Sequence, residues 1–351
     1  MSKNREKIRS ATGDPEHVFL KVSVLSMFLL AAVLFSFLIG RYSISPSELL
    51  SLIASRAGLV KDCLDPTAEM IFFSVRLPRV LCALLVGAGL SVAGCSYQGV
   101  FRNPMVSPDI LGATAGSGFG AAIAMLLDFS TAGIQIFSFA TGLLAVFLSY
   151  MICVFTGKRS NPTLTLILAG MVISALFQAG ISLIKYVADP YTKLPEITFW
   201  LLGSLASVNM NDVMQLFIPI AAACIPLFMY RWELNLLSFS DEEAQSMGVS
   251  ITRLRITVII CSTVIASAVV SVCGIIGWVG LIIPHLARMI VGPNYKILIP
   301  SGILLGGTYL LLVDDIARGW MAMEIPLGIL TAIAGTPFFI FLLCRGRGES
   351  L

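Results

Sequence analysis

The stretch Arg76–Gly112, RLPRVLCALLVGAGLSVAGCSYQGVFRNPMVSPDILG, decides the class of fold. Within it the run 80–101 contains no charged residue, and about 20 apolar residues are enough for a helix to cross the hydrocarbon core of a bilayer. Arg76 and Arg79 precede this run, and Arg102-Asn103-Pro104 follows it. We therefore predict a membrane-spanning helix whose polar ends mark the two faces of the membrane.

The composition of the whole chain agrees with this interpretation. Of 351 residues, 57% are hydrophobic and 12% are charged, whereas soluble domains carry about 25% charged residues. Further uncharged stretches recur at 129–157, 160–184, 213–230, 256–284, 297–313 and 325–344. Lipid offers no hydrogen-bond partner, so such stretches must form helices that satisfy their own backbone groups. The sequence predicts an all-α polytopic membrane protein.

We expect ten spans and a short external half-helix at Ile197–Ser207, which is too short to cross. The spans are placed at roughly 18–39, 80–100, 110–127, 132–156, 163–187, 213–230, 255–274, 276–291, 297–314 and 325–344. An even number puts both termini on one face. If that face is cytoplasmic, it holds 15 of the 23 lysines and arginines, as the positive-inside rule requires. These are Lys3, Arg5, Lys7, Arg9, Lys21, Arg102, Lys158, Arg159, Arg231, Arg253, Arg255, Arg288, Lys296, Arg345 and Arg347.

The domain organisation follows from these spans. Residues 1–17 form a cytoplasmic N-terminal tail, 18–344 a single transmembrane domain, and 345–351 a cytoplasmic C-terminal tail. The longest internal connection is 231–254. Within it, Ser240 is a plausible N-cap with Glu243 three residues on, which is the capping-box pattern, and Gly248 would end the helix. A short capped helix here predicts a docking element for a soluble partner; the alternative is a solvated surface helix.

Sequence signals for catalysis, metal binding and nucleotide binding are missing. Gly157-Lys158 lacks the upstream glycine of a P-loop, and the two histidines form no HExxH motif. The eight cysteines are scattered singly, and the net charge of +3 gives no case for nucleic acid. Gly112, Gly116, Gly120 and Ala124 repeat every four residues, as do Ala83, Gly87 and Ser91, and both stripes predict close helix packing. We expect no catalytic residue, no metal site and no cofactor.

Charged residues inside the spans are also few. Every Asp, Glu, Lys and Arg falls near a predicted span end, and Asp314, Asp315 and Arg318 lie where the ninth span leaves the membrane. Ion-coupled carriers usually keep ionisable residues at mid-membrane. The pattern therefore disfavours a secondary carrier or channel, which stays the alternative. An ABC exporter is opposed by the ten spans and the missing P-loop.

A series of motifs runs in order along the chain. They are RLPR (Arg76–Arg79), QGVFRNP (Gln98–Pro104), PDILG (Pro108–Gly112), FWLLGSL (Phe199–Leu205), Ala244–Gly248, GWVGLIIPHLAR (Gly277–Arg288), DIAR (Asp315–Arg318), EIPLG (Glu324–Gly328) and GTPFF (Gly335–Phe339). Together they resemble the permease subunit of bacterial ABC importers for iron–siderophore complexes, haem and cobalamin. The resemblance covers most of the chain, from about Phe72 to Phe341.

This resemblance implies an architecture and a set of partners. The permeases of that family have ten spans and cytoplasmic termini. Two such subunits, identical or different, associate in the membrane with two cytoplasmic ATPases and an external substrate-binding protein. The resemblance therefore implies a non-catalytic translocation subunit in a bacterial or archaeal cytoplasmic membrane, which works by alternating access while its partners hydrolyse ATP.

The resemblance also assigns roles to particular residues. The ATPase-coupling segment carries Ser240, Glu243, Ala244, Met247 and Gly248. Docking of the binding protein falls to Arg76, Arg79 and Arg318; for Arg76 and Arg79, a snorkelling interface anchor is the alternative. The translocation path or gate falls to Asn161, Pro162, Thr163, Leu164, Gln178 and Ser182, although interhelical hydrogen bonds explain the last two about as well. The doubled acid Asp314-Asp315 departs from this picture, because a local salt bridge would reduce the availability of Arg318.

Overall fold

The computed structural model describes residues 15–40, 42, 44–56, 65–156, 162–321 and 323–345, and every regular element in these ranges is helical. Within these ranges, seven helical stretches are long and apolar enough to cross a membrane. They are α2 (Pro15–Leu38), the continuous run of α4 (Pro66–Met70), η1 (Ile71–Arg76) and α5 (Leu77–Val100), α7 (Thr131–Thr156), α8 (Pro162–Val187), α10 (Met210–Met229), α13 (Ile251–Cys273) and α15 (Tyr295–Gly319). The chain is thus a multi-pass α-helical membrane protein.

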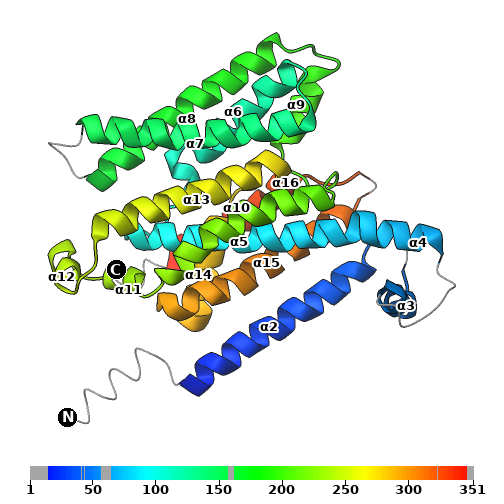
Figure 1. Ribbon diagram of the computed structural model, residues 1–351, viewed down its shortest axis with the longest axis horizontal. Coiled ribbons are helices and arrows are strands. Elements are labelled where there is room, and N and C mark those ends of the chain that lie inside the picture. Colours follow the sequence, from blue (N-terminus) through cyan, green and yellow to red (C-terminus); the bar gives the residue numbers. More distant parts are fainter. Residues whose placement is uncertain are drawn as a thin grey trace.

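Three shorter apolar helices accompany the long ones. They are α6 (Ala113–Leu126), α14 (Val279–Val291) and α16 (Leu327–Arg345). The remaining elements are α3 (Pro46–Arg56), η2 (Pro108–Leu111), α9 (Lys193–Leu201), α11 (Glu233–Leu236) and α12 (Asp241–Ser246). In Figure 1 the long helices run side by side, with α11 and α12 at one end of the bundle and α3, α4 and α9 at the other.

Helix α5 forms the centre of the fold, and small residues let its neighbours approach. A Cβ atom added to Gly87 would lie 2.1 Å from the Gly306 carbonyl oxygen of α15. On α6, a Cβ at Gly120 would lie 1.9 Å from Thr141 Oγ1 of α7. Close approach of backbones supplies the dispersion contacts that hold helices together in lipid. The predicted packing role of both small-residue stripes is confirmed.

The half-helix differs from its expected bounds of Ile197–Ser207, because α9 covers Lys193–Leu201. Gly203 adopts a φ of +76°, and its Cβ would lie 2.5 Å from the Ile275 carbonyl oxygen. Its own carbonyl accepts a hydrogen bond from the Leu327 amide at 2.8 Å. The chain therefore leaves the helix at Leu202 to pack against the segments that follow α13 and precede α16. These tertiary contacts end the helix earlier than the uncharged run suggests.

Two helices extend beyond the spans that the sequence predicted. The second span was placed at 80–100, yet the helix is continuous from Pro66 and includes Arg76 and Arg79. The ninth span was placed at 297–314, yet α15 continues to Gly319 and also includes Asp315 and Arg318. Opposite charges on α5 and α15 pair with one another, so both helices continue through residues that were expected to mark a membrane boundary.

Candidate coupling and translocation sites

Helix α12 begins with the predicted capping box. The Ser240 hydroxyl accepts a hydrogen bond from the Glu243 amide at 3.2 Å, and the Ser240 amide donates to Glu243 Oε2 at 3.0 Å. These bonds satisfy amides that the first turn of a helix leaves without partners. The amide and hydroxyl of Ser240 hold the pKa of the Glu243 carboxyl below its usual range. The beginning of the helix is thus defined by its own sequence.

The end of α12 is equally well defined. The Gly248 amide donates to the Gln245 carbonyl at 2.9 Å, and the Val249 amide donates to the Ala244 carbonyl at 3.2 Å, which together form a Schellman motif. Gly248 has a φ of +88°, and a Cβ there would meet no atom within 4 Å. Glycine is therefore required for its backbone conformation and not for space. The predicted C′ role of Gly248 is confirmed.

One side of α12 is anchored to the bundle and the other is free. Ala244 is fully buried against the body of the protein. Met247 is 46% exposed, and Phe239, just before the helix, is 47% exposed. The loop around α12 therefore exposes large apolar side chains while Ala244 anchors the helix.

Arg102 ties this loop to the end of α5, a role that the sequence reading missed. Its guanidinium donates to the carbonyl oxygens of Leu237 at 2.6 Å and Phe239 at 2.8 Å, and to Asp241 Oδ1 at 2.6 Å. Arg102 itself has a φ of +49°. A movement of α12 would therefore act on α5 through three hydrogen bonds. The only sequence signal was a lone arginine directly after an uncharged run.

The expected path residues from Pro162 to Ser182 lie on α8, which occupies the outer edge of the bundle beside α6 and α7 (Figure 1). Its buried side, which includes Ile173 and Phe177, packs on the neighbouring helices. Gln178 and Ser182 lie on the opposite, exposed face, and the Ser182 hydroxyl donates to the Gln178 carbonyl at 3.0 Å. The two side chains share one face, as their spacing predicted.

The exposed face of α8 is otherwise apolar and extends over the length of the helix. It presents Leu164, Leu168, Met171, Val172, Leu176, Leu183, Tyr186 and Val187, each at least 52% exposed. Among the expected gate residues, Leu164 belongs to this face and Thr163 is half-buried. Pro162 begins α8, while Asn161 lies outside the described residues.

The three arginines expected to dock an external protein are buried. Arg79 is 5% exposed; its Nε lies 2.9 Å from Asp314 Oδ2, and its Nη2 lies 2.9 Å from Glu324 Oε2. Both carboxylates belong to this chain, one on α15 and one in the connection to α16. The guanidinium is thereby neutralised inside the protein. This geometry contradicts the expectation that Arg79 faces outward.

Arg318 and Arg76 are also turned inward. Arg318 is 6% exposed, forms a salt bridge with Asp315 and donates to the Ser36 carbonyl oxygen of α2 at 2.6 Å. Arg76 is 3% exposed and donates to the carbonyl oxygens of Phe37 and Tyr42. The predicted salt bridge of Arg318 with the doubled acid is confirmed. These arginines hold α2 against the bundle, which corrects their expected outward orientation.

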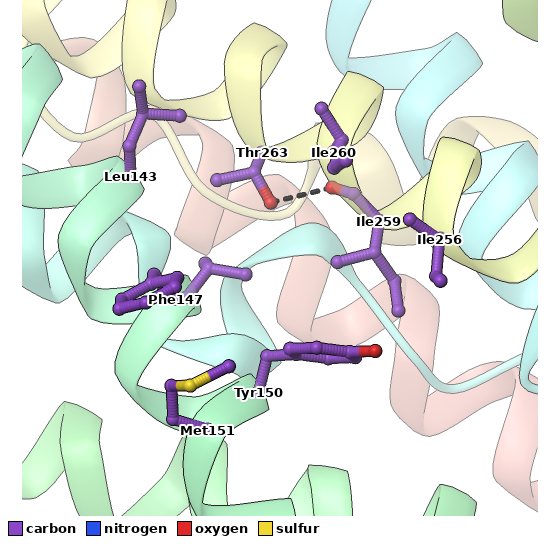
Figure 2. A pocket seen from close by; sticks show the side chains of 9 residues that line it. Leu143, Phe147, Tyr150, Met151, Ile256, Ile259, Ile260 and Thr263 are labelled. Carbon is purple, nitrogen blue, oxygen red and sulfur yellow. Dashed lines mark hydrogen bonds between the residues drawn. The ribbon is translucent and has the colours of Figure 1, made fainter. Parts of the chain in front are cut away.

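An apolar groove of about 410 Å³ lies between α7 and α13 and shows no feature of a cargo site. Figure 2 shows its side chains, and the Thr263 hydroxyl donates to the Ile259 carbonyl at 2.6 Å instead of pointing into the groove as a free donor. Its lining is Leu143, Val146, Phe147, Tyr150, Met151, Ile256, Ile259, Ile260 and Thr263. Such a lining suits contact with lipid chains better than recognition of a polar cargo.

Named proteins are similar to this chain in sequence over most of its length. The molybdate import system permease protein MolB of Haemophilus influenzae is 42% identical over 325 residues, which cover 92% of this chain and 95% of the relative. A probable iron chelatin transport system permease of Helicobacter pylori is 41% identical over 280 residues, which cover 80% of this chain and 84% of the relative.

A solved structure agrees with these relatives. It is described as the inward-facing conformation of a metal-chelate type ABC transporter, and it superposes with a TM-score of 0.82 at 41% identity, covering 92% of this chain and 98% of its own. The model of the FecCD transport family matches residues 28–345. The chain belongs to the FecCD transport family, and it is a membrane permease of the ABC-importer type.

Proposed function

We propose that this chain is the translocation subunit of an ATP-driven importer in a bacterial or archaeal cytoplasmic membrane. The seven long helices and the three shorter ones would form ten spans, with both termini and α12 on the cytoplasmic side. Partner ATPases would bind α12 and hydrolyse the ATP. The observation that carries the proposal is the capped α12, which lies outside the apolar helices and is tied to α5 by Arg102.

The free face of α8 supports a second permease subunit as a partner. A continuous apolar surface on an edge helix needs either lipid or protein against it, and Gln178 and Ser182 add polar groups that lipid would not satisfy. Two α8 helices facing each other would enclose a weakly polar path. Leu164, Thr163 and the neighbouring residues at the beginning of α8 would then lie where an inner gate is needed.

An external binding protein would deliver cargo at the end of the bundle that carries α3 and α9. Since Arg76, Arg79 and Arg318 are buried, docking would rely on other side chains at this end, such as Glu69 and Glu196, which are exposed. The buried arginines would instead keep the external ends of α2, α5 and α15 together.

The cargo we propose is a metal chelate of the iron–siderophore, haem or cobalamin class. Related permeases are named for hemin and cobalamin as well as for iron chelatin. A molybdate-type oxyanion is the second candidate, because the relative at 42% identity over 92% of this chain is named for molybdate. Binding of both cargo classes to the cognate external protein, measured by calorimetry, separates the two.

The coupling assignment can be tested with two glycines that share a positive φ and open space around the α-carbon. Gly248 and Gly292 have φ values of +88° and +87°, and an added Cβ meets no atom within 4 Å at either position. Alanine at Gly248 adds about 1–2 kcal/mol of left-handed strain, and alanine at Gly292 adds at least as much, because its ψ of −179° lies in a region almost exclusive to glycine. We expect Gly248→Ala to weaken ATPase association and ATP-driven uptake, while Gly292→Ala leaves both near wild type.

Three outcomes decide the proposal. Equal effects of the two substitutions would show general destabilisation and reject α12 as the coupling element. Unchanged association and uptake in Gly248→Ala, or in a variant lacking 241–247, would reject it as well. Purification of an active transporter without any ATPase would favour the secondary carrier.

A further inference from the structure

The end of α5 and the end of α14 meet around a pocket. Gln98 and Arg102 lie at the end of α5, and Arg288 lies near the end of α14, 190 residues from Gln98 along the chain. They face a cavity of about 300 Å³ beside α11 and the beginning of α15. The cavity is lined by Gln98, Gly99, Arg102, Asn103, Pro104, Leu234, Leu237, Ser238, Arg288 and Tyr295.

The charge of this pocket is not balanced. Arg288 is half-buried, and its guanidinium donates to Gln98 Oε1, which is neutral. Within the described part of the chain, no carboxylate lies within 4.0 Å of Arg288. Arg102, by contrast, is paired with Asp241 at 2.6 Å. Placing a guanidinium in a partly buried site without a counter-charge is costly, and a bound anion would remove that cost.

The lining also selects the kind of anion. None of the described residues that line the cavity is an Asp or Glu, so a cation gains nothing there. The Tyr295 and Ser238 hydroxyls and the Asn103 amide add hydrogen-bond donors to the two arginines. A guanidinium presents its donors as a fork that matches two oxygens of one anion. The volume accommodates a group of four oxygens around one central atom.

We propose that this pocket binds a tetrahedral oxyanion of the phosphate type, either free in solution or as the headgroup of an anionic phospholipid. Arg288 supplies the main charge, and Tyr295 supplies a hydroxyl. Because Arg102, which lines the cavity, also donates to the carbonyl oxygens of Leu237 and Phe239, the bound oxyanion lies next to the loop that leads to α12. The inference rests on the pocket alone and not on the proposed transport function.

The test uses the full chain in its complex, reconstituted in nanodiscs. In one arm, nanodiscs of phosphatidylcholine are titrated with inorganic phosphate, sulfate or molybdate against chloride of equal ionic strength, and the thermal midpoint is recorded. In the other arm, phosphatidylglycerol replaces part of the phosphatidylcholine, and retained lipid is measured by native mass spectrometry. The variants are Arg288→Gln, Tyr295→Phe and the control Arg253→Gln, which removes an exposed arginine of α13 outside the pocket.

We expect one arm to show binding that Arg288→Gln weakens by about tenfold or more, since it loses a charged hydrogen bond. Tyr295→Phe, which keeps the packing of the ring, should weaken it less, and Arg253→Gln should leave it unchanged. A response to free oxyanions identifies the soluble source, and a response only to phosphatidylglycerol identifies the lipid source.

Three results would overturn the inference. The first is no binding in either arm by the wild-type complex. The second is an equal loss of binding in Arg288→Gln and Arg253→Gln, which would show that binding depends only on the overall positive charge of the surface. The third is weakened ATPase association in Arg288→Gln without any oxyanion or lipid binding, which would make the pocket a contact for a protein carboxylate.

Discussion

Arginine–aspartate pairs occur at both ends of this bundle, and their surroundings give them opposite roles. At the end with α4, Arg79 and Asp314 are 5% and 0% exposed. At the end with α12, Arg102 and Asp241 are 44% and 48% exposed. A buried pair cannot lose one partner without leaving an unsolvated charge, whereas water replaces a partner at an exposed pair. The first pair therefore fixes the fold, and the second positions a movable loop.

The largest effect is expected from Arg79→Ala, which tests whether the buried pair stabilises the fold. It leaves Asp314 buried without its main partner, so we expect a loss of about 3–5 kcal/mol in the free energy of unfolding. Unfolding by denaturant in detergent micelles measures it. The double variant Arg79→Met with Asp314→Leu removes both charges and should recover most of the loss. If the double variant is no more stable than the single one, burial of an unpaired charge is not the cause.

The close packing of the buried region can be tested at Gly87. A Cβ there would lie 2.1 Å from a backbone oxygen of α15, which cannot move without shifting the helix. We expect Gly87→Ala to lower the free energy of unfolding by about 1–3 kcal/mol. Gly277→Ala is the matched control, because a Cβ at Gly277 meets no atom within 4 Å. Similar losses in both variants would contradict the packing explanation.

The stability of α12 should depend more on the N-cap at Ser240 than on the salt bridge between Arg102 and Asp241. Ser240→Ala removes a side-chain acceptor from the first turn of α12, and N-cap losses amount to about 1 kcal/mol. We expect faster amide hydrogen exchange over 241–248, with little change in the thermal midpoint of the whole protein. Ser240→Asp, which also caps, should restore protection. A global loss of stability would show that α12 is part of the rigid core.

The smallest effect should come from the exposed pair. A double-mutant cycle of Arg102→Gln and Asp241→Asn is expected to give a coupling free energy of about 0.2–1 kcal/mol, which decreases with salt. The same cycle on Arg79 and Asp314 should give a larger value that salt hardly changes. Comparable coupling free energies for the two pairs would contradict the different roles assigned to the buried pair and the exposed pair.

Local features of the sequence predicted much of this structure. The apolar runs predicted the long helices, because a membrane helix must satisfy its own backbone. Ser240, Glu243 and Gly248 predicted both ends of α12, because capping depends on residues within one turn. The stripe that contains Gly87 predicted close packing, although not that α15 would be the partner. Each of these predictions rests on interactions over a few residues.

The errors concern residues whose environment depends on distant parts of the chain. Arg79 was expected to face outward, because nothing near it in sequence reveals a carboxylate; its partners are Asp314 and Glu324. The end of α9 was predicted too late in the sequence, because the sequence does not reveal that the Gly203 carbonyl accepts a hydrogen bond from the Leu327 amide. Arg102 was predicted only to mark a face of the membrane, because its acceptors lie in the loop before α12, far away in sequence.

The sequence by itself determined that the chain is an all-α membrane protein with a capped helix in a polar loop, because hydropathy and capping act locally. Only the tertiary structure decided which charges are buried and paired, which are exposed, and which remain unbalanced. Charge pairing requires side chains to meet in space, and in this protein most of the decisive partners are more than 100 residues apart. The roles of Arg79, Arg102 and Arg288 therefore became apparent only from the folded chain.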